Sequence, residues 1–150
     1  MAYSKSDIYL DDMKDLLDTY WIEYREVPKP RFMVVNDPDD SESRIDYNMG
    51  DIIIITTDGS EQLKFRGNIQ YYDRIVPVSL DIRTMENRQR LHDIYKMLRM
   101  ILFNRKHDFP NYQLIRMLGY QEMVNQEKNI WRGVFRVQIE NNCIPVEVLA

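Results

Sequence analysis

Asp51, Glu61 and Lys64 are the residues whose types and spacing could support catalysis. A magnesium-dependent nuclease needs clustered carboxylates to hold the metal and a lysine near the attacking water. Asp51 opens an isoleucine-rich run, and the other two follow a predicted hairpin turn. The spacing is generic, since each residue also fits as a charge at a strand end or on a hairpin surface. A magnesium-dependent nuclease is therefore an alternative hypothesis, and we predict no catalytic or metal-binding residue.

The remaining reactive side chains give no stronger pattern. The chain has one cysteine, Cys143, so a disulfide framework or a cysteine zinc site is excluded. A nucleophile pair between Cys143 and a histidine stays open, although a lone cysteine near a terminal strand is more often a small buried hydrophobe. His92 and His107 lie on or just after a predicted helix, and His92 is expected to face solvent. No glycine-rich phosphate loop occurs. We predict no cofactor and no enzymatic activity.

Charged residues suited to protein contacts form a clearer pattern. Basic residues cluster on or beside a predicted helix near the middle of the chain, while the segment 36–48 is turn-rich and acidic, typical of a flexible surface loop. Opposite charges on different parts of one small domain suit head-to-tail contacts between copies or a partner of mixed charge. The candidate contact residues are Arg88, Lys96, Arg99, Asp37, Asp39, Asp40, Asp58 and Gly59.

The whole-chain properties are those of one soluble globular domain. The 150 residues are 44% hydrophobic and 29% charged, with a net charge of −4. The pI of about 5.2 argues against a protein that mainly coats nucleic acid. The polar, acidic start does not resemble a secretory leader, and no apolar run reaches the length of a membrane span. We expect a reducing intracellular setting.

A strand that leads directly into a long helix organises the chain. Alternating apolar residues predict the strand over 74–83, and a 3.6-residue apolar period from Leu91 to Leu102 predicts the helix. Thr84 is the expected N-cap, and Pro110 ends any continuation. Pro77 within the strand should lie at a sheet edge or a bulge, because proline donates no backbone hydrogen bond.

The other segments predict a second helix and the partners of that strand. Ser6 is the expected cap of a helix from Asp7 to about Arg25. The run 51–57 predicts a strand buried on both faces, and Asp58-Gly59 predicts a hairpin that returns through 62–66. The remaining predicted strands are 31–35, 113–120 with a bulge at Gly119, 130–140, and a short last strand from Cys143 after a turn at Asn141-Asn142. This order predicts a single α+β domain over 1–150, with a mostly antiparallel sheet packed against an N-terminal helix and a long central helix.

The layout resembles the tail terminator, or tail completion, proteins of tailed bacteriophages and archaeal viruses. The matching segments are DDMKDLLDTYW, VPKPRFMVV, DIIIITTDG, RIVPVSLDIRTMENRQRLHDIYKMLRMIL and WRGVFRVQIE. They cover most of the chain, although the resemblance is one of pattern. The acidic insert at 36–48 and the residues around Met117 to Lys128 depart from a minimal member, which leaves a head–tail connector or baseplate role open.

The resemblance implies a structural virion protein that is assembled in the host cytoplasm and located in the tail or neck. Six copies would form a ring that caps the tail tube and joins the tail to the head. The implied partners are other copies of the chain, the tail tube protein and head–tail connector or neck proteins, with the tail sheath as a further candidate. No membrane and no sequence-specific nucleic acid is expected. The alternatives are the nuclease and a small adaptor domain that binds one protein through the basic helix face.

Overall fold

The computed structural model describes residues 5–21, 27–35, 50–57, 61–65, 67, 70–105, 114–123 and 130–145. Side chains are described from Leu10 to Asn141, within the same limits. The candidate residues Asp37, Asp39, Asp40, Asp58 and Gly59 lie outside the described residues. The conformations of the acidic loop and of the Asp58-Gly59 turn itself are therefore not described.

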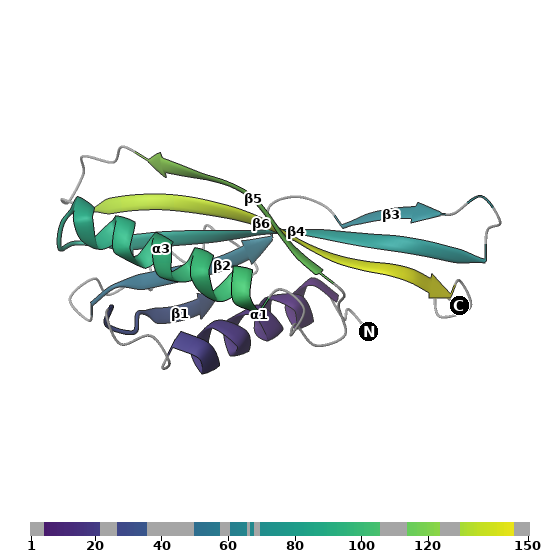
Figure 1. Cartoon of the computed structure of the whole chain (residues 1–150), viewed down its shortest axis with the longest axis horizontal. Coiled ribbons are helices and arrows are strands. Elements are labelled where there is room, and N and C mark those ends of the chain that lie inside the picture. Colours follow the sequence, from purple (N-terminus) through teal and green to yellow (C-terminus); the bar gives the residue numbers. More distant parts are fainter. Residues whose placement is uncertain are drawn as a thin grey trace.

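The described chain is an α+β domain, as predicted, with two helices and a mixed six-stranded sheet (Figure 1). The elements are α1 (Lys5–Trp21), β1 (Arg31–Val34), β2 (Ile52–Thr57), β3 (Gln62–Phe65), β4 (Tyr71–Thr84), α3 (Arg88–Asn104), β5 (Leu114–Met123) and β6 (Trp131–Pro145). The strand order is β1-β2-β4-β6-β5, and β3 also pairs with β4. Only the pair of β1 and β2 is parallel among the described strands.

One long ladder forms the axis of the sheet. β4 pairs with β6 from Tyr71 opposite Pro145 to Thr84 opposite Trp131. On the other edge of β4, β2 pairs with the C-terminal half and β3 with the N-terminal half, both antiparallel. β2 and β3 therefore run in the same direction, one after the other, and the predicted hairpin between them is wrong. In a hairpin, β2 and β3 would pair with each other. Here β4 is long enough for both to pair with it instead.

Pro77 lies where β4 changes partners. On one side Pro77 is opposite Gln138 of β6. On the other side, the last pair with β2 is at Val78 and the first pair with β3 is at Ile75. A residue without a backbone donor is tolerated at such an interruption. Pro77 is therefore in a central strand, at a gap in its pairing rather than at an outer edge of the sheet.

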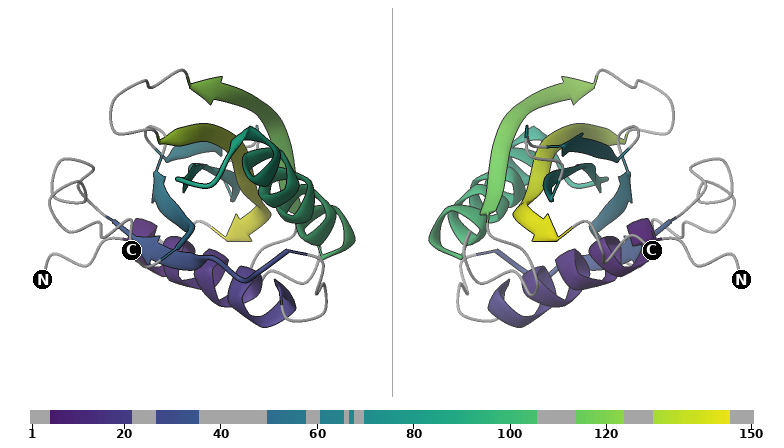
Figure 2. Two further views of the ribbon diagram at one scale, coloured as in Figure 1. Left: turned by 90° about the vertical axis from the view of Figure 1, so that its left-hand side faces the viewer. Right: turned by 90° about the vertical axis from the view of Figure 1, so that its right-hand side faces the viewer.

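The main core lies on one face of the sheet, beneath both helices. Val76, Val78, Leu80 and Ile82 of β4 alternate onto this face and are fully buried. They join apolar residues of α1, α3, β2 and β6 in one cluster. Figure 2 shows the curved sheet from both ends, with the helices on one side of it. Ile52–Ile55 of β2 are all buried, which confirms the prediction of a strand covered on both faces.

Both predicted helix caps are wrong. Ser6 lies inside α1, which begins at Lys5. Thr84 is the last residue of β4, and Asn87 caps α3 by accepting a hydrogen bond from the backbone N–H of Arg90 at 2.8 Å. The Thr84 hydroxyl instead donates to Asp51 Oδ1 at 2.5 Å. The strand runs one residue beyond the predicted end at 83, so the helix starts later.

Two register shifts interrupt the ladders of β6, one with β5 and one with β4. The register of β5 on β6 shifts between Met117 and Gly119, which confirms the predicted bulge. At Asn141-Asn142 the chain does not turn, because β6 continues to Pro145. The register with β4 shifts there instead, between Tyr72 and Arg74, and β6 takes up one extra residue.

The two longest strands carry a projection beyond the helices, which we call the β-arm. It consists of β3, residues 71–75 of β4 and residues 140–145 of β6. Figure 1 shows it extending to the right of α1 and α3. The molecule thus has a helix-covered body and a three-stranded arm that share β4 and β6.

Candidate functional site

The exposed side of α3 carries a mixed basic and apolar surface, the α3 outer stripe. It consists of Lys96, Arg99, Met100 and Phe103, whose spacing places them along one side of the helix. Met100 and Phe103 are 45% and 58% exposed, although the inner face of α3 is buried. The two predicted contact residues therefore lie beside two large apolar side chains. The sequence analysis did not identify the apolar pair. Met100 and Phe103 could have been found there, because they fall outside the 3.6-residue period of the apolar residues expected to be buried.

An aromatic stack supports Arg99. Its guanidinium carbon lies 5.2 Å from the centre of the Tyr95 ring, within the range of a cation–π contact. Tyr95 stacks on Tyr120 of β5 at a centroid distance of 3.9 Å and meets Phe135 edge-on at 5.2 Å. Burial, with smaller contributions from nearby charges, raises the pKa of Tyr120 to about 12. Arg99 is thus an exposed charge on a stacked aromatic base.

Arg88, the third predicted contact on α3, is bonded within the molecule. Its Nε donates to Glu122 Oε1 at 2.9 Å and its Nη2 donates to Glu122 Oε2 at 3.1 Å. His92 Nε2 lies 3.4 Å from the same carboxylate. The His92 side chain, which was expected to face solvent, is 42% exposed. The hydrogen bond from Arg88 holds the pKa of Glu122 below its usual value. Arg88 therefore ties the start of α3 to β5, while its side chain stays 62% exposed. Its role as a contact residue stays a prediction.

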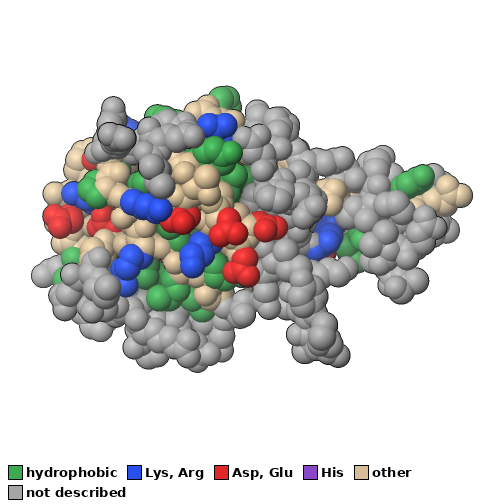
Figure 3. Space-filling view, turned by 90° about the horizontal axis from the view of Figure 1, so that it is seen from below, with side chains coloured by type: hydrophobic (Ala, Val, Ile, Leu, Met, Phe, Trp, Pro, Cys, Tyr) green, Lys and Arg blue, Asp and Glu red, His purple; other side chains and the backbone are tan. Residues whose placement is uncertain are grey.

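Acidic side chains gather on the outer side of α1. Asp11, Asp15 and Asp18 are exposed there, and Lys29 pairs with Asp18 at 2.5 Å. Burial, and then the charges of Asp15 and Asp11, raise the pKa of Asp12. Figure 3, seen from the α1 side, shows acidic groups in a band across the body, with Lys and Arg side chains beside them. The α3 outer stripe and the acidic side of α1 are separate surfaces.

The structure does not bring the nuclease candidates together. Asp51 accepts hydrogen bonds from Thr84 and, at 3.2 Å, from Arg90, so its carboxylate joins the start of β2 to α3. Glu61 forms an ion pair with Arg74 in the β-arm. Ile52 is level with Arg83 of β4, whereas Gln62 is level with Ile75. Eight residues of extended chain separate these levels, roughly 25 Å at 3.3 Å per residue. Among the described residues, no three metal-ligating side chains cluster.

A charged cluster that the sequence did not reveal lies on the sheet face opposite the helices. Asp81 accepts from Arg83 Nη2 at 3.1 Å and from Arg132 Nε at 3.0 Å. Asp81 and Arg83 are only 8% and 7% exposed. They lie beside Ile52 and Ile54, which form a second small apolar cluster with Val35. Alternation along the strands predicts that these polar residues share one face of the sheet. It does not predict which charges pair. The cluster joins neighbouring strands through hydrogen bonds and ion pairs among its own charged groups.

The β-arm exposes apolar side chains on an edge strand. All four residues of β3 are exposed, with Leu63 at 42% and Phe65 at 54%. The Phe65 ring lies 5.8 Å from that of Tyr72, which is buried. Within the described residues, β3 pairs only with β4, so its other edge offers backbone groups to a further strand. An exposed apolar edge strand is a candidate binding surface.

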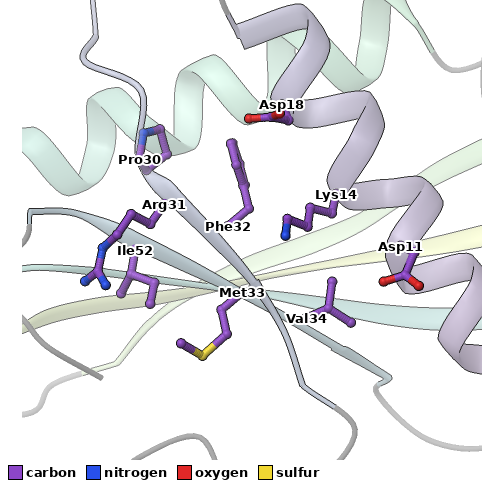
Figure 4. A pocket seen from close by; sticks show the side chains of 9 residues that line it. All are labelled: Asp11, Lys14, Asp18, Pro30, Arg31, Phe32, Met33, Val34 and Ile52. Carbon is purple, nitrogen blue, oxygen red and sulfur yellow. The ribbon is translucent and has the colours of Figure 1, made fainter. Parts of the chain in front are cut away.

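A groove runs along the outer edge of β1, beside α1. It has a volume of about 630 Å³ and is lined by Asp11, Lys14, Asp18, Pro30, Arg31, Phe32, Met33, Val34 and Ile52. Figure 4 shows Phe32 and Val34 pointing toward α1, whereas Met33 points the other way. The two strand side chains toward α1 are apolar, and the helix side chains are charged. The outer edge of β1 is thus a second edge to which a strand from another chain could pair. The side chains of that strand could enter the groove.

Comparison with known proteins adds no identification. No protein-family model matches the chain, and no curated protein matches it either. In the described part of the chain, no helix is long and apolar enough to cross a membrane. The functional argument therefore rests on the surfaces described above: the α3 outer stripe, the exposed edge of the β-arm and the groove beside β1.

Proposed function

We propose that the protein is a structural subunit of a virus particle, with a role like that of the tail terminator proteins it resembles. In this proposal several copies, usually six, form a ring that caps the tail tube and joins the tail to the head or neck. The protein is then located in the virion and is not an enzyme. Its partners are other copies, the tail tube protein, the connector or neck proteins and the tail sheath.

The observation that carries the proposal is the β-arm. Two strands of 14 and 15 residues extend past the helices to present an edge strand with exposed Leu63 and Phe65. A monomeric domain gains nothing from such an edge, which invites pairing with other chains. An assembly subunit can use it to add a strand to a neighbouring protein. The α3 outer stripe supplies a second exposed contact surface of different chemistry.

The α3 outer stripe also favours a second candidate, a small adaptor domain. Its two basic and two apolar side chains suit an acidic partner with an apolar anchor. An adaptor would bind through this stripe alone and would stay outside the particle. The third candidate, a nuclease, receives no support from the separated positions of Asp51 and Glu61.

Sedimentation of lysate from infected or producing cells tests the proposal first. We expect the protein to travel with particles or tails in a few copies each, and imaging should place it at one end of the tail. A protein that stays entirely in the soluble fraction, while particles form without it, would contradict the virion role and favour the adaptor.

A charge reversal on the α3 outer stripe tests the contact residues. Arg99→Glu should abolish incorporation into particles while the circular dichroism spectrum and melting temperature stay near those of the wild type. Arg99→Lys keeps the charge at the same position and should be incorporated normally, so it is the matched control. Normal particle assembly with Arg99→Glu would remove the stripe from the proposal. Arg88→Glu is a poor test, since it also places two carboxylates together at Glu122.

A further inference from the structure

The edge of the sheet that contains β1 and β3 is stepped. β1 lies outside β2, whereas β3 pairs directly with β4 on the same side, so β1 projects one strand further out. Through β2, Arg31 is level with Arg83 of β4, while Gln62 of β3 is level with Ile75. The edge therefore has a projecting strand and a recessed strand. Each is four residues long, and they lie roughly 25 Å apart along the sheet.

Both parts of the step have backbone groups available for pairing. The N–H groups of Arg31 and Val35 bond to Asp51 and Ile55, at 2.9 and 3.0 Å. Because backbone groups alternate in direction along a strand, those of Phe32 and Val34 point away from β2. In the described chain, neither β1 nor β3 has a strand on its outer side. Unpaired edges of this kind are templates for another chain.

The step is complementary to itself. A second copy turned by half a turn about the normal of the sheet would place its projecting β1 beside the recessed β3 of the first copy. The same rotation places β1 of the first copy beside β3 of the second. β1 and β3 run in the same direction within one copy, because β1 is parallel to β2 and both β2 and β3 are antiparallel to β4. The rotation therefore makes both new pairs antiparallel.

The side chains favour one register for this pairing. Phe32 and Val34 lie on the helix side of the sheet, and Leu63 and Phe65 lie on the same side, opposite Arg74 and Tyr72. Antiparallel pairing with Phe32 opposite Phe65 and Val34 opposite Leu63 keeps the helix faces of both copies on one side. The exposed arm residues then enter the groove beside α1 (Figure 4). A slip of one residue would put Lys64 into the groove instead, so the register is specified.

We propose that two copies form a two-fold symmetric dimer in which β1 of each pairs with β3 of the other, making one continuous sheet. The inference does not depend on the proposed function, since the stepped edge is present whatever the chain assembles into. Such a contact closes after two copies and cannot build a six-membered ring. If the ring exists, the dimer is the free form that covers the edges, and it opens when ring assembly begins.

Cysteine cross-linking in the full chain tests the geometry. Met33 and Lys64 are directly opposite in the specified register and lie on the sheet face away from the helices. Opposite residues of antiparallel strands have Cα atoms about 4.5 to 5.5 Å apart, within the range that a disulfide spans. Within one copy these residues are far apart along the sheet. The variant Met33→Cys with Lys64→Cys, in a Cys143→Ser background, should give a covalent dimer as the end product under mild oxidation.

A matched control and the opposing outcomes make the test decisive. Met33→Cys with Gln62→Cys uses the same sheet face, two residues out of register, and should cross-link at least tenfold more slowly. A ladder of trimers and larger species would overturn the two-fold geometry and favour head-to-tail contacts. Equal cross-linking of the two pairs would overturn the register.

Equilibrium sedimentation of the cysteine-free protein gives an independent measurement. The mass should rise from 18.2 kDa toward twice that value as the concentration increases. Leu63→Asp should weaken the dimer at least tenfold, whereas Gln62→Asp, on the opposite face of β3, should change it less than about threefold. A wild type that stays monomeric to millimolar concentration would overturn the dimer. The particle sedimentation described above decides the proposed function separately.

Discussion

Asp81 shows how a single carboxylate can hold a face of the sheet together. It lies on β4 between Arg83 of the same strand and Arg132 of β6, with bonds of 2.8 to 3.1 Å. Buried charges are stable only where opposite charges and hydrogen bonds replace their hydration. Asp81 supplies both to two arginines at once. Its removal leaves two partly desolvated cations side by side.

The first prediction concerns this carboxylate. Asp81→Asn should lower the free energy of unfolding by about 3 kcal/mol, since breaking a buried charge pair leaves the partner uncompensated. Urea denaturation followed by tryptophan fluorescence measures it. Asp15→Asn, an exposed carboxylate on α1, is the control and should change stability by less than about 0.5 kcal/mol. Similar small losses in both variants would mean that the cluster contributes little.

The second prediction concerns pH. The pKa of Glu122 is lowered in the folded state, chiefly by the hydrogen bond from Arg88, so its stabilising effect is present above the unfolded pKa. That effect is lost as the pH falls below the usual value of 4.5 and through the folded pKa. Glu122→Gln should therefore flatten the fall in melting temperature between pH 5 and 3. An unchanged slope in this variant would remove Glu122 from acid unfolding.

At the scale of elements, packing between β5, β6 and α3 depends on one glycine. A Cβ atom at Gly133 of β6 would lie 2.6 Å from Tyr120 Cε1. Tyr120 cannot move away easily, because its ring stacks on Tyr95 of α3. The absence of a side chain at position 133 thus lets the aromatic stack lie directly on the sheet. The glycine is required for close approach rather than for an unusual backbone conformation.

The third prediction follows from that contact. Gly133→Ala should destabilise the protein by about 2 kcal/mol, the usual cost of overpacking a filled core. Gly119→Ala, at the β5 bulge, is the control, since a Cβ there meets nothing within 4 Å. Adding Tyr120→Ala should remove most of the extra cost of Gly133→Ala in a double-mutant cycle of thermal unfolding. Additive losses would show that the two residues do not interact.

Local patterns predicted the elements better than their partners. Alternation in 74–83 and the 3.6-residue period after it located β4 and α3, since both reflect one buried face. The pair Asp58-Gly59 fits a hairpin, but β4 is long enough to pair with β2 and β3 in succession. Asn141-Asn142 fits a turn, but pairing with β4 carries the strand through as a bulge. In both cases strand pairing between distant segments overrode a local turn preference. A short window of sequence contains no information on that pairing.

The same limit applies to the candidate site. Lys96 and Arg99 were identified because charge is visible in sequence, and both are exposed on α3. The internal pairing of Arg88 with Glu122 depends on β5, which lies 34 residues away along the chain. The β1 groove and the stepped edge depend on strand order. They could not be found before the topology was known.

For the whole molecule, the division into body and β-arm sets where it opens most easily. The body has two helices over a continuous core cluster, whereas β3 has a single pairing partner among the described strands and four exposed side chains. Elements with few buried contacts open locally at less free energy than the core. The arm is therefore the region that can rearrange upon binding.

The fourth prediction is measured by hydrogen exchange. Amides of β3 should exchange at least a hundredfold faster than those of Val78–Ile82 in β4, which need global unfolding. The experiment is done at micromolar concentration, so that the exchange measured is that of the arm in the monomer. Ile53–Ile55 of β2 serve as an internal reference on the same edge of β4. Uniform protection of β2 and β3 would mean that the arm is as stable as the body.

The shared β4–β6 ladder also sets an order of events during synthesis. Residues 62–75 leave the ribosome on the order of 70 residues before 140–145, a delay of several seconds at typical rates. Until then β3 and its half of β4 form at most an isolated hairpin, which is marginal in water. Leu63, Phe65 and Tyr72 are then exposed together on the nascent chain. Synonymous codons that slow translation of 76–139 should thus lower the soluble yield without changing the finished protein.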